Sequence, residues 1–495
     1  MDADASAEVV IRGEADGHEA AGGSAADGKA RRPRPGKALS WIGPAIALLL
    51  IALSLGRFLH GAGRGSSSAD DSVTGPASAQ VGLAGTGSQD IAALDAATRA
   101  RPDDPHAWQQ LGSASLRDAI RTLDPASYER ATSALQRARQ LAPTDPTNDV
   151  LQGTLALSLH HFDQALGFGQ AALGRRPDNV EALGVVVDAQ VELGRYDEAQ
   201  ATLQRMLDQR PSLPALSRAS YQRELRGDLD GALVAMVQAE VAGGGTTAVG
   251  PSDTAGAFDV ATIVSLQGDI LWQSGRVDEA ARRYDEALRL SPDLPGAVIG
   301  LARTEAVAGR TTDAIDRLDR LVRKVPLPAA ATLLGDLQAG LGRSADAARN
   351  YELVRLTYRL QQASGAAVDL EQALFEADHG GEPQATLGLA ASAYSARKTI
   401  YAADALAWAR HRAGDDAGAI AALSEAGRLG TKDPLLHYHA AAALTAVGQV
   451  DAAKVELRQS IDANPWFTFS PAVRAEAAAL ADQLGIDTPS WRNHR

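Results

Sequence analysis

The sequence predicts an all-α protein, an α-solenoid in which short helix pairs stack one on the next. Prolines recur at a step of 34 residues, at Pro143, Pro177 and Pro211 and again at Pro292 and Pro326. Between them, apolar residues follow helical spacing on both sides of a glycine. The 495-residue chain is 45% hydrophobic but only 4% aromatic. Its core is therefore built mainly of Ala, Leu and Val, which suits thin, closely packed helix pairs better than a sheet.

Residues 180–211 show how one unit is built. Gly194 ends the first helix, because a left-handed C-cap costs least without a Cβ. Ala199 places a small residue in the second helix, and Leu203 and Met206 continue its apolar face. Pro211 ends the unit, since proline cannot continue a helix. A helix pair this small cannot bury its apolar face alone, so the units must stack.

The best copy of this unit lies at 264–292. Its small, aromatic and proline positions are Gly268, Gly275, Ala280, Tyr284, Ala287 and Pro292. This order at a period of 34 resembles the tetratricopeptide repeat. The resemblance implies a solenoid whose concave groove is lined by the first helix of each repeat and holds peptides. The motif residues are packing residues, so they predict the fold and say nothing of chemistry.

The N-terminal region predicts a membrane anchor. Residues 1–37 have no apolar period and predict a disordered tail. The tail ends in five basic residues, Lys29, Arg31, Arg32, Arg34 and Lys37. Residues 38–56 then carry no charge, and as a helix they span roughly 28 Å, enough to cross a bilayer. The excess of positive charge before this segment places the N-terminus in the cytoplasm and the repeats outside it.

Other interpretations of residues 38–56 are weaker. A cleaved signal peptide would have an unusually long n-region and a poor small-x-small cleavage site. A buried core helix does not fit between a disordered tail and a linker. A twin-arginine signal is not supported, because Arg31 and Arg32 are followed by Pro33. The inverted topology, with a cytoplasmic solenoid, stays open.

The remainder of the chain is expected to be a linker, two groups of repeats and a cap. Residues 57–88 form a flexible linker, and a first lone helix covers 91–100. The first half of the solenoid, 89–246, is separated by a Gly-rich spacer at 247–260 from the second half, 261–467. Residues 468–495 hold a capping helix that starts at Ser470 and ends at Gly485, followed by a tail.

Ten repeats are expected between 105 and 467. A seven-residue insertion around 117–125 is placed between the two helices of the first repeat. The repeat bounds are 105–145, 146–179, 180–212, 213–246, 261–294, 295–327, 328–361, 366–399, 400–433 and 434–467.

The sequence predicts neither an enzyme nor a cofactor or metal site. The absence of cysteine excludes disulfides and thiolate chemistry, and a net charge of −13 argues against a nucleic-acid partner. Ser395 and Lys398 match a serine–lysine motif by chance, without its companion motifs. The histidines at 160–161 and 437–439 point apart on a helix and make no chelate by themselves. An enzyme or metal-handling protein that uses the repeats as a frame remains the alternative.

A protein or peptide partner is the predicted ligand, and an acidic groove would favour a basic one. Asp188, Asp269 and Asp336 recur at one inward position of three repeats, and Tyr401 and Trp408 share a face in a later one. Aromatic side chains are enriched at binding hot spots, although such residues can also fill core gaps, and acids can simply keep a surface soluble. The residues predicted to contact a partner on the concave face are Glu181, Asp188, Asp269, Trp272, Arg303, Asp336, Tyr401, Asp404, Trp408, His411 and Tyr438.

The predicted function is a membrane-anchored scaffold or adaptor that binds proteins outside the cytoplasmic membrane. The abundance of Arg, Ala and Gly indicates a GC-rich, bacterial genome.

The chaperone-tail clamp found in this family needs Lys, Asn or Arg at inward positions. This chain has Val150, Thr154, Gly184 and Asp188 there, so it is not expected to hold such tails.

Overall fold

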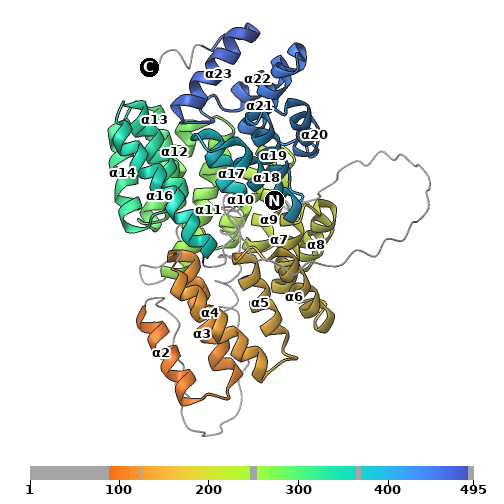
Figure 1. Ribbon diagram of the computed structural model, residues 1–495. Coiled ribbons are helices and arrows are strands. Elements are labelled where there is room, and N and C mark those ends of the chain that lie inside the picture. The colour runs from red at the N-terminus through yellow and green to blue at the C-terminus, as the bar shows by residue number, and fades with distance from the viewer. Residues whose placement is uncertain (1–87, 123, 246–253, 364–368, 489–495) are drawn as a thin grey trace, which may run out of the picture. The chain divides into compact units, whose positions relative to one another are not determined.

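A computed structural model describes residues 88–122, 124–245, 254–363 and 369–488 (Figure 1). These residues form 22 α-helices and no strand. All of them belong to one structural unit. The all-α fold class predicted from the sequence is confirmed, and the predicted anchor at 38–56 lies outside the described residues.

The helices follow the predicted pairs. A single helix, α2, precedes the pairs and another, α23, follows them. Their bounds are α2 Ser88–Ala100, α3 Pro105–Thr122, α4 Pro125–Leu141, α5 Pro146–Ser158, α6 Phe162–Arg175, α7 Val180–Glu192, α8 Tyr196–Gln209, α9 Leu213–Leu225, α10 Leu229–Ala242, α11 Thr254–Gln273, α12 Val277–Leu290, α13 Pro295–Val307, α14 Thr311–Lys324, α15 Pro328–Gly340, α16 Ser344–Ala363, α17 Asp369–Asp378, α18 Pro383–Ala396, α19 Ile400–Arg412, α20 Asp416–Ala426, α21 Pro434–Ala446, α22 Val450–Ala463 and α23 Pro471–Leu484.

Local sequence signals fix most of these boundaries. Several helices start with proline in their first turn behind a capping side chain, as Asp145 caps α5 and Ser470 caps α23. Gly194 follows α7 with a φ of 73°, the left-handed conformation that the sequence required of it. Two boundaries differ from expectation. The insertion in the first repeat lengthens α3 instead of forming a loop, and α11 begins at Thr254, within the predicted spacer.

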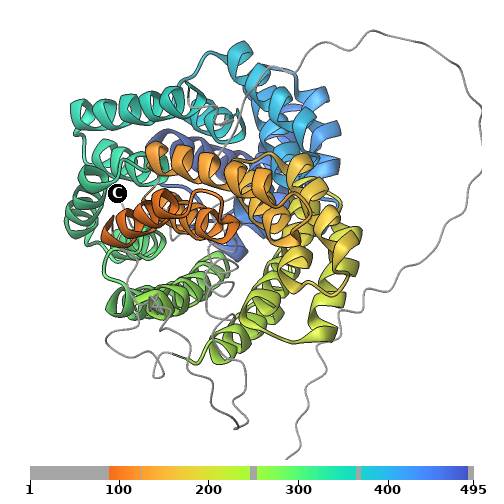
Figure 2. The ribbon, with the colours of Figure 1, turned by 90° about the horizontal axis from the view of Figure 1, so that it is seen from below.

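The solenoid folds back on itself. In Figure 2 the blue helices α18–α20 lie beside the yellow helices α7 and α8. The Tyr196 hydroxyl, at the start of α8, accepts a hydrogen bond of 3.0 Å from the backbone N–H of Ile400. Arg428 donates to the carbonyl oxygens of Gly194 (3.1 Å) and Lys398 (2.7 Å). Repeats about 200 residues apart in the sequence therefore touch, and successive turns of the superhelix are packed together.

Three turn glycines lie in this contact between turns. A Cβ on Gly194 would overlap the carbonyl oxygen of Lys398, and one on Gly275 would lie 2.7 Å from that of Ala463. Gly227 similarly faces the carbonyl oxygen of Gly430 at 2.5 Å. These glycines are needed twice, for their positive φ and for the close approach of the second turn.

Among the described residues, no helix has both the length and the apolar character to cross a bilayer.

Two glycine substitutions separate the backbone effect from the packing effect. Gly414 has the same left-handed conformation as Gly194 (φ 79° and 73°), but no atom lies within 4 Å of its would-be Cβ. Gly414→Ala should therefore cost only about 1–2 kcal/mol of unfolding free energy, from the strained backbone. Gly194→Ala should cost at least about 2 kcal/mol more, because its methyl group pushes the turns apart.

Urea unfolding followed by circular dichroism measures both variants. Limited proteolysis of the native state adds a second readout, since separated turns expose the segment around Lys398. Equal stability and equal cleavage for the two variants would contradict the packed-turn arrangement.

Candidate functional site

The first helix of each repeat lines the inner face, and most of it is covered by protein. In α7 every residue from Ala182 to Glu192 is buried, and the same holds for α5 from Asn148 to Ser158. A helix that is apolar all round is typical of such a fully enclosed position. The predicted partner-binding residues therefore have to be judged by the contacts they make within the chain.

Asp188 is held in a buried ion pair. The Arg218 guanidinium donates two hydrogen bonds to its carboxylate, of 2.7 and 2.6 Å, from α9 to α7. A Cβ on Gly184 would lie 3.2 Å from this guanidinium, so the small residue makes room for it. Burial raises the pKa of Asp188, while the guanidinium opposes that rise. The pair joins two repeats.

The acids of two other repeats serve as acceptors for tyrosines. The Tyr284 hydroxyl donates to Asp269 at 2.8 Å, and the Tyr351 hydroxyl donates to Asp336 at 2.9 Å. In both repeats the tyrosine follows the acid by 15 residues, on the second helix of the same pair. Asp336 also accepts from the His379 ring at 2.9 Å. The periodic acid thus has a packing reason in these two repeats.

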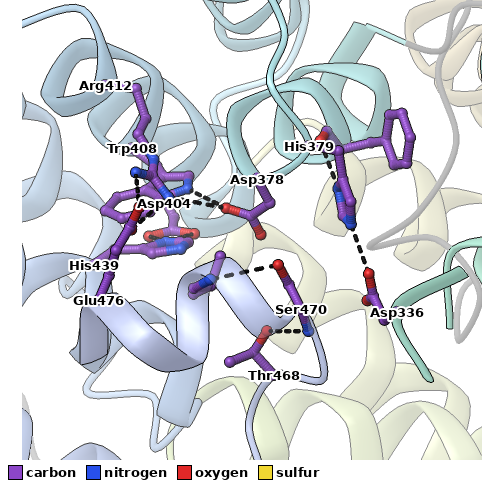
Figure 3. Close-up of polar contacts among 12 residues, drawn as sticks. Asp336, Asp378, His379, Asp404, Trp408, Arg412, His439, Thr468, Ser470 and Glu476 are labelled. Atoms are coloured by element: carbon purple, nitrogen blue, oxygen red, sulfur yellow. Dashed lines mark hydrogen bonds and ion pairs between the residues drawn. The ribbon is translucent and has the colours of Figure 1, made fainter. Parts of the chain in front are cut away.

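The predicted aromatic cluster is also enclosed (Figure 3). Trp408 is only 1% exposed. Its indole N–H donates to Asp378 at 2.8 Å, and the His439 ring stacks on it with centroids 4.1 Å apart. His439 in turn contacts Asp404 through Nδ1 at 2.9 Å. Arg412 lies over the Trp408 ring and pairs with Glu476 of α23 at 2.8 Å.

The chain's own segment 464–470 covers two more of the predicted aromatics. Phe467 stacks on Tyr438 with centroids 5.0 Å apart, and Phe469 stacks on Trp272 at 6.1 Å. The side-chain amide of Asn464 donates to the backbone carbonyl of Trp272 at 2.8 Å. The segment, which is not helical, therefore occupies part of the inner face.

The remaining predicted residues are half-buried. Glu181 lies in the first turn of α7, and Arg303 on α13 is close enough to Asp269 to favour its ionised form. Tyr401 packs beside α17 and α18, and His411 contacts Asp416 at 2.6 Å. The structure thus brings Asp404, Trp408, His411 and Tyr438 together, and it places Glu181, Asp188 and Asp269 in other repeats. Their role in binding a partner stays a prediction.

The described residues also line an open pocket, called the inner pocket below. It has a volume of about 630 Å³ and lies between the ends of α13 and α15, the segment 465–471 and α23. Leu341 on its wall is 47% exposed. Arg474 lies over the Trp466 ring at 5.3 Å on the opposite side. Of the predicted residues, Asp336 lines this pocket.

Buried carboxyl groups line the contact between the superhelical turns. Arg397 pairs with Glu192 at 3.0 Å and with Glu371 at 3.4 Å, and all three are buried. Burial raises the pKa of Glu371 to about 8, because the single Arg397 guanidinium can neutralise only one of the two carboxylates. Burial, with Asp269 and Asp433 nearby, likewise raises the pKa of Glu224 to about 8. The carboxyl groups of Glu224 and Glu371 are therefore mostly protonated at neutral pH.

No group of three or more His, Cys, Asp or Glu side chains in the described ranges is arranged to hold a metal ion.

Sequence reasoning missed the partners of its predicted residues. Arg218 and His379 were not singled out, because the acids that they contact, Asp188 and Asp336, lie in other repeats. Phe467 and Phe469 carried a signal, since aromatic residues are scarce elsewhere in the chain. The pairs Asp269–Tyr284 and Asp336–Tyr351 carried a second signal, because the same spacing of 15 residues occurs in both repeats.

Glu224 makes the packing pH-dependent. Its pKa is about 8 in the folded protein against a reference of 4.5, so the folded state binds the extra proton between these values. Stability should therefore fall as the pH rises from about 5 to 9. Glu224→Gln should remove part of this loss, stabilising the protein by about 1–2 kcal/mol at pH 9 and leaving it nearly unchanged at pH 5.

Urea unfolding at both pH values is the measurement. Glu456→Gln is the control, because Glu456 of α22 pairs with His437 of α21, within a single helix pair. The same gain at pH 9 in both variants would show that Glu224 is not the group that titrates.

Parts of the sequence are similar to a known repeat family and to two curated proteins. A family model described as tetratricopeptide repeat matches residues 156–220 and 271–337. Among curated proteins, "Cellulose synthase 2 operon protein C" of Komagataeibacter xylinus is 28% identical over 324 residues, covering 60% of this chain and 23% of that protein. "Cellulose synthase operon protein C" of Xanthomonas axonopodis pv. citri is 29% identical over 276 residues, covering 54% and 17%. The chain spans less than a quarter of the length of these relatives.

Solved structures give a weaker likeness. The human IFIT1 dimer with PPP-AAAA matches with a TM-score of 0.43 at 16% identity, over 66% of this chain and 73% of that one. Yeast Tom70 matches with a TM-score of 0.34 at 13% identity, over 78% and 97%. Scores below 0.5 do not define how the repeats are arranged. The matched family and the helix pairs agree with the 34-residue period, which supports tetratricopeptide repeats at residues 156–220 and 271–337.

Proposed function

We propose that the protein is a membrane-attached scaffold that holds a segment of a partner protein in the inner pocket beside α13, α15 and α23. The observation that carries this proposal is the pocket itself. At about 630 Å³ it falls within the range of about 300–1,000 Å³ usual for binding sites. Partner binding is the function that tetratricopeptide repeats generally serve.

The lining of the pocket indicates the chemistry of its ligand. Val307, Leu337 and Leu341 provide apolar walls, and Trp466 and Phe469 add aromatic ones. Such walls suit an aromatic or large aliphatic side chain as the anchor of the bound segment.

A second, larger groove is a poorer candidate. It has a volume of about 900 Å³ between α20, α21 and α22. Its walls include Leu423, Leu436 and Leu444, and no aromatic residue lines it. Two acids line it, and one of them, Glu456, is paired with His437 at 2.6 Å, while the other is Asp462. The groove therefore offers acids but no aromatic anchor.

The attachment to a membrane rests on the sequence. Residues 38–56 carry no charge and follow a basic stretch. As a membrane helix they would place the repeats outside the cytoplasm, with residues 57–87 as the tether. The curated relatives are named for a cellulose synthase operon, so components of an exopolysaccharide synthase are the first partners to test.

Two leucine variants test the pocket. Leu341 and Leu356 are 47% and 44% exposed, and only Leu341 lines the pocket. Leu341→Asp should reduce partner capture at least about tenfold, because it places a charge where an apolar anchor binds. Leu356→Asp should leave capture unchanged. The measurement is affinity purification of the full chain from detergent-solubilised membranes, with quantification of the proteins that copurify.

Equal capture by both leucine variants would show that partners bind elsewhere. Circular dichroism of the two proteins verifies that both are folded.

A second test concerns topology. Alkaline phosphatase fused after Arg495 should be active, because the enzyme needs an extracytoplasmic location, and the same fusion of green fluorescent protein should be dark. The deletion of residues 38–56 is the control, which should reverse both readouts. A fluorescent, phosphatase-inactive full chain would establish the inverted topology.

A further inference from the structure

The inner pocket lies where the described chain stops. Thr488 is only 3% exposed and lines the pocket, together with Asp482 of the preceding helix α23. The sequence continues with residues 489–495, Pro-Ser-Trp-Arg-Asn-His-Arg. Resting on the proposed function of this pocket, we propose that residues 489–495 occupy it, with the Trp491 side chain as the anchor.

The chain length allows this placement. Trp491 follows Thr488 by three residues, which reach at most about 10 Å when extended. Since Thr488 already forms part of the wall, the indole can enter the pocket without any movement of α23. Pro489 fixes its own φ and biases Thr488 towards an extended backbone, so little conformational freedom is lost on docking.

The pocket and the indole are complementary. Ala306, Val307 and Leu337 give the pocket an apolar wall, and Trp466 and Phe469 also line it. Leu341 is exposed at the edge, and a docked indole would cover it. Burying a tryptophan in this way removes a large apolar surface from water, and it also shields the exposed side chain of Leu341 from water.

Charge sets the direction of the segment. It carries Arg492 and Arg495 and no acid. Asp482, in the last turn of α23, lines the pocket, and the exposed Asp487 follows that helix. Asp336 of α15 also lines the pocket, but it already accepts from Tyr351 and His379. Arg474, in the first turn of α23, is the opposing cation, and it lies over the Trp466 ring at 5.3 Å. The arginines of the segment should therefore lie near the C-terminal end of α23, away from Arg474, while Trp491 points inward.

A tethered occupant would control access to the pocket. A segment held by a short linker is present at an effective concentration of about millimolar, so a partner must compete with it. The favoured partner then resembles the occupant, with an aromatic anchor beside basic residues. Such a ligand also agrees with the acidic balance of the whole chain.

Engineered cysteines test the placement cleanly, because the chain has none of its own. Gly340 lines the pocket, and an added Cβ would meet only Pro471 at 4.0 Å. The test protein is the full chain in detergent with Gly340→Cys and Ser490→Cys, which keeps Trp491. The matched control combines Ser490→Cys with Gln483→Cys, an exposed residue of α23 that does not line the pocket. Disulfide formation under mild oxidation is followed on non-reducing gels and assigned by mass spectrometry.

Docking predicts that the 340–490 pair closes at least about tenfold faster than the 483–490 pair, because only docking holds residue 490 near the pocket. Adding Trp491→Ala should slow the 340–490 pair at least about fivefold and leave the control pair unchanged. Equal rates for the two pairs, or no effect of Trp491→Ala, would overturn the proposal.

Partner capture separates this inference from the proposed function. Trp491→Ala alone should increase the partner captured by the full chain, since the competitor is weakened, whereas Leu341→Asp should decrease it. If crosslinking succeeds and Leu341→Asp leaves capture unchanged, the segment docks but the pocket is not the partner site. If crosslinking fails and Leu341→Asp still abolishes capture, the partner site stands and the docked segment does not.

Discussion

The contact between successive superhelical turns is the constraint on which the rest of the structure depends. It is made by a few polar contacts, including the Tyr196 hydroxyl with the Ile400 backbone and Arg397 with Glu192. Glycines at the repeat turns allow the backbones to approach. Because the turns touch, the first helices are enclosed on both sides. An open pocket lies beside α13, α15 and α23.

The enclosed inner face explains why so many polar side chains are buried. A buried charge is costly unless it is paired, and the chain supplies partners across repeats, as Arg218 does for Asp188. Where a single guanidinium serves two acids, as Arg397 does, one carboxyl group keeps its proton. The packing of the turns is consequently linked to pH, in the direction that favours the closed arrangement at lower pH.

Aromatic residues contribute to the same closure. The segment 464–470 inserts Phe467 and Phe469 against Tyr438 and Trp272, two of the aromatics that sequence reasoning assigned to a partner. An intramolecular aromatic segment thus already lies on the inner face. A second one, residues 489–495, is proposed for the pocket beside it. In both cases the protein's own chain takes the place that an external peptide would take in an open repeat array.

The sequence by itself determined the repeats, because helix period, turn glycines and prolines are local signals that each repeat carries in full. It determined the bounds of most helix pairs and of α23 for the same reason. Only the tertiary structure decided which contacts the predicted site residues make. Asp188 could not be recognised as the partner of Arg218, nor Asp336 as the acceptor of His379, since these contacts join different repeats. The packing of residues near 196 on residues near 400 depends on the small rotation between neighbouring repeats, summed over the array, and no single repeat encodes that sum.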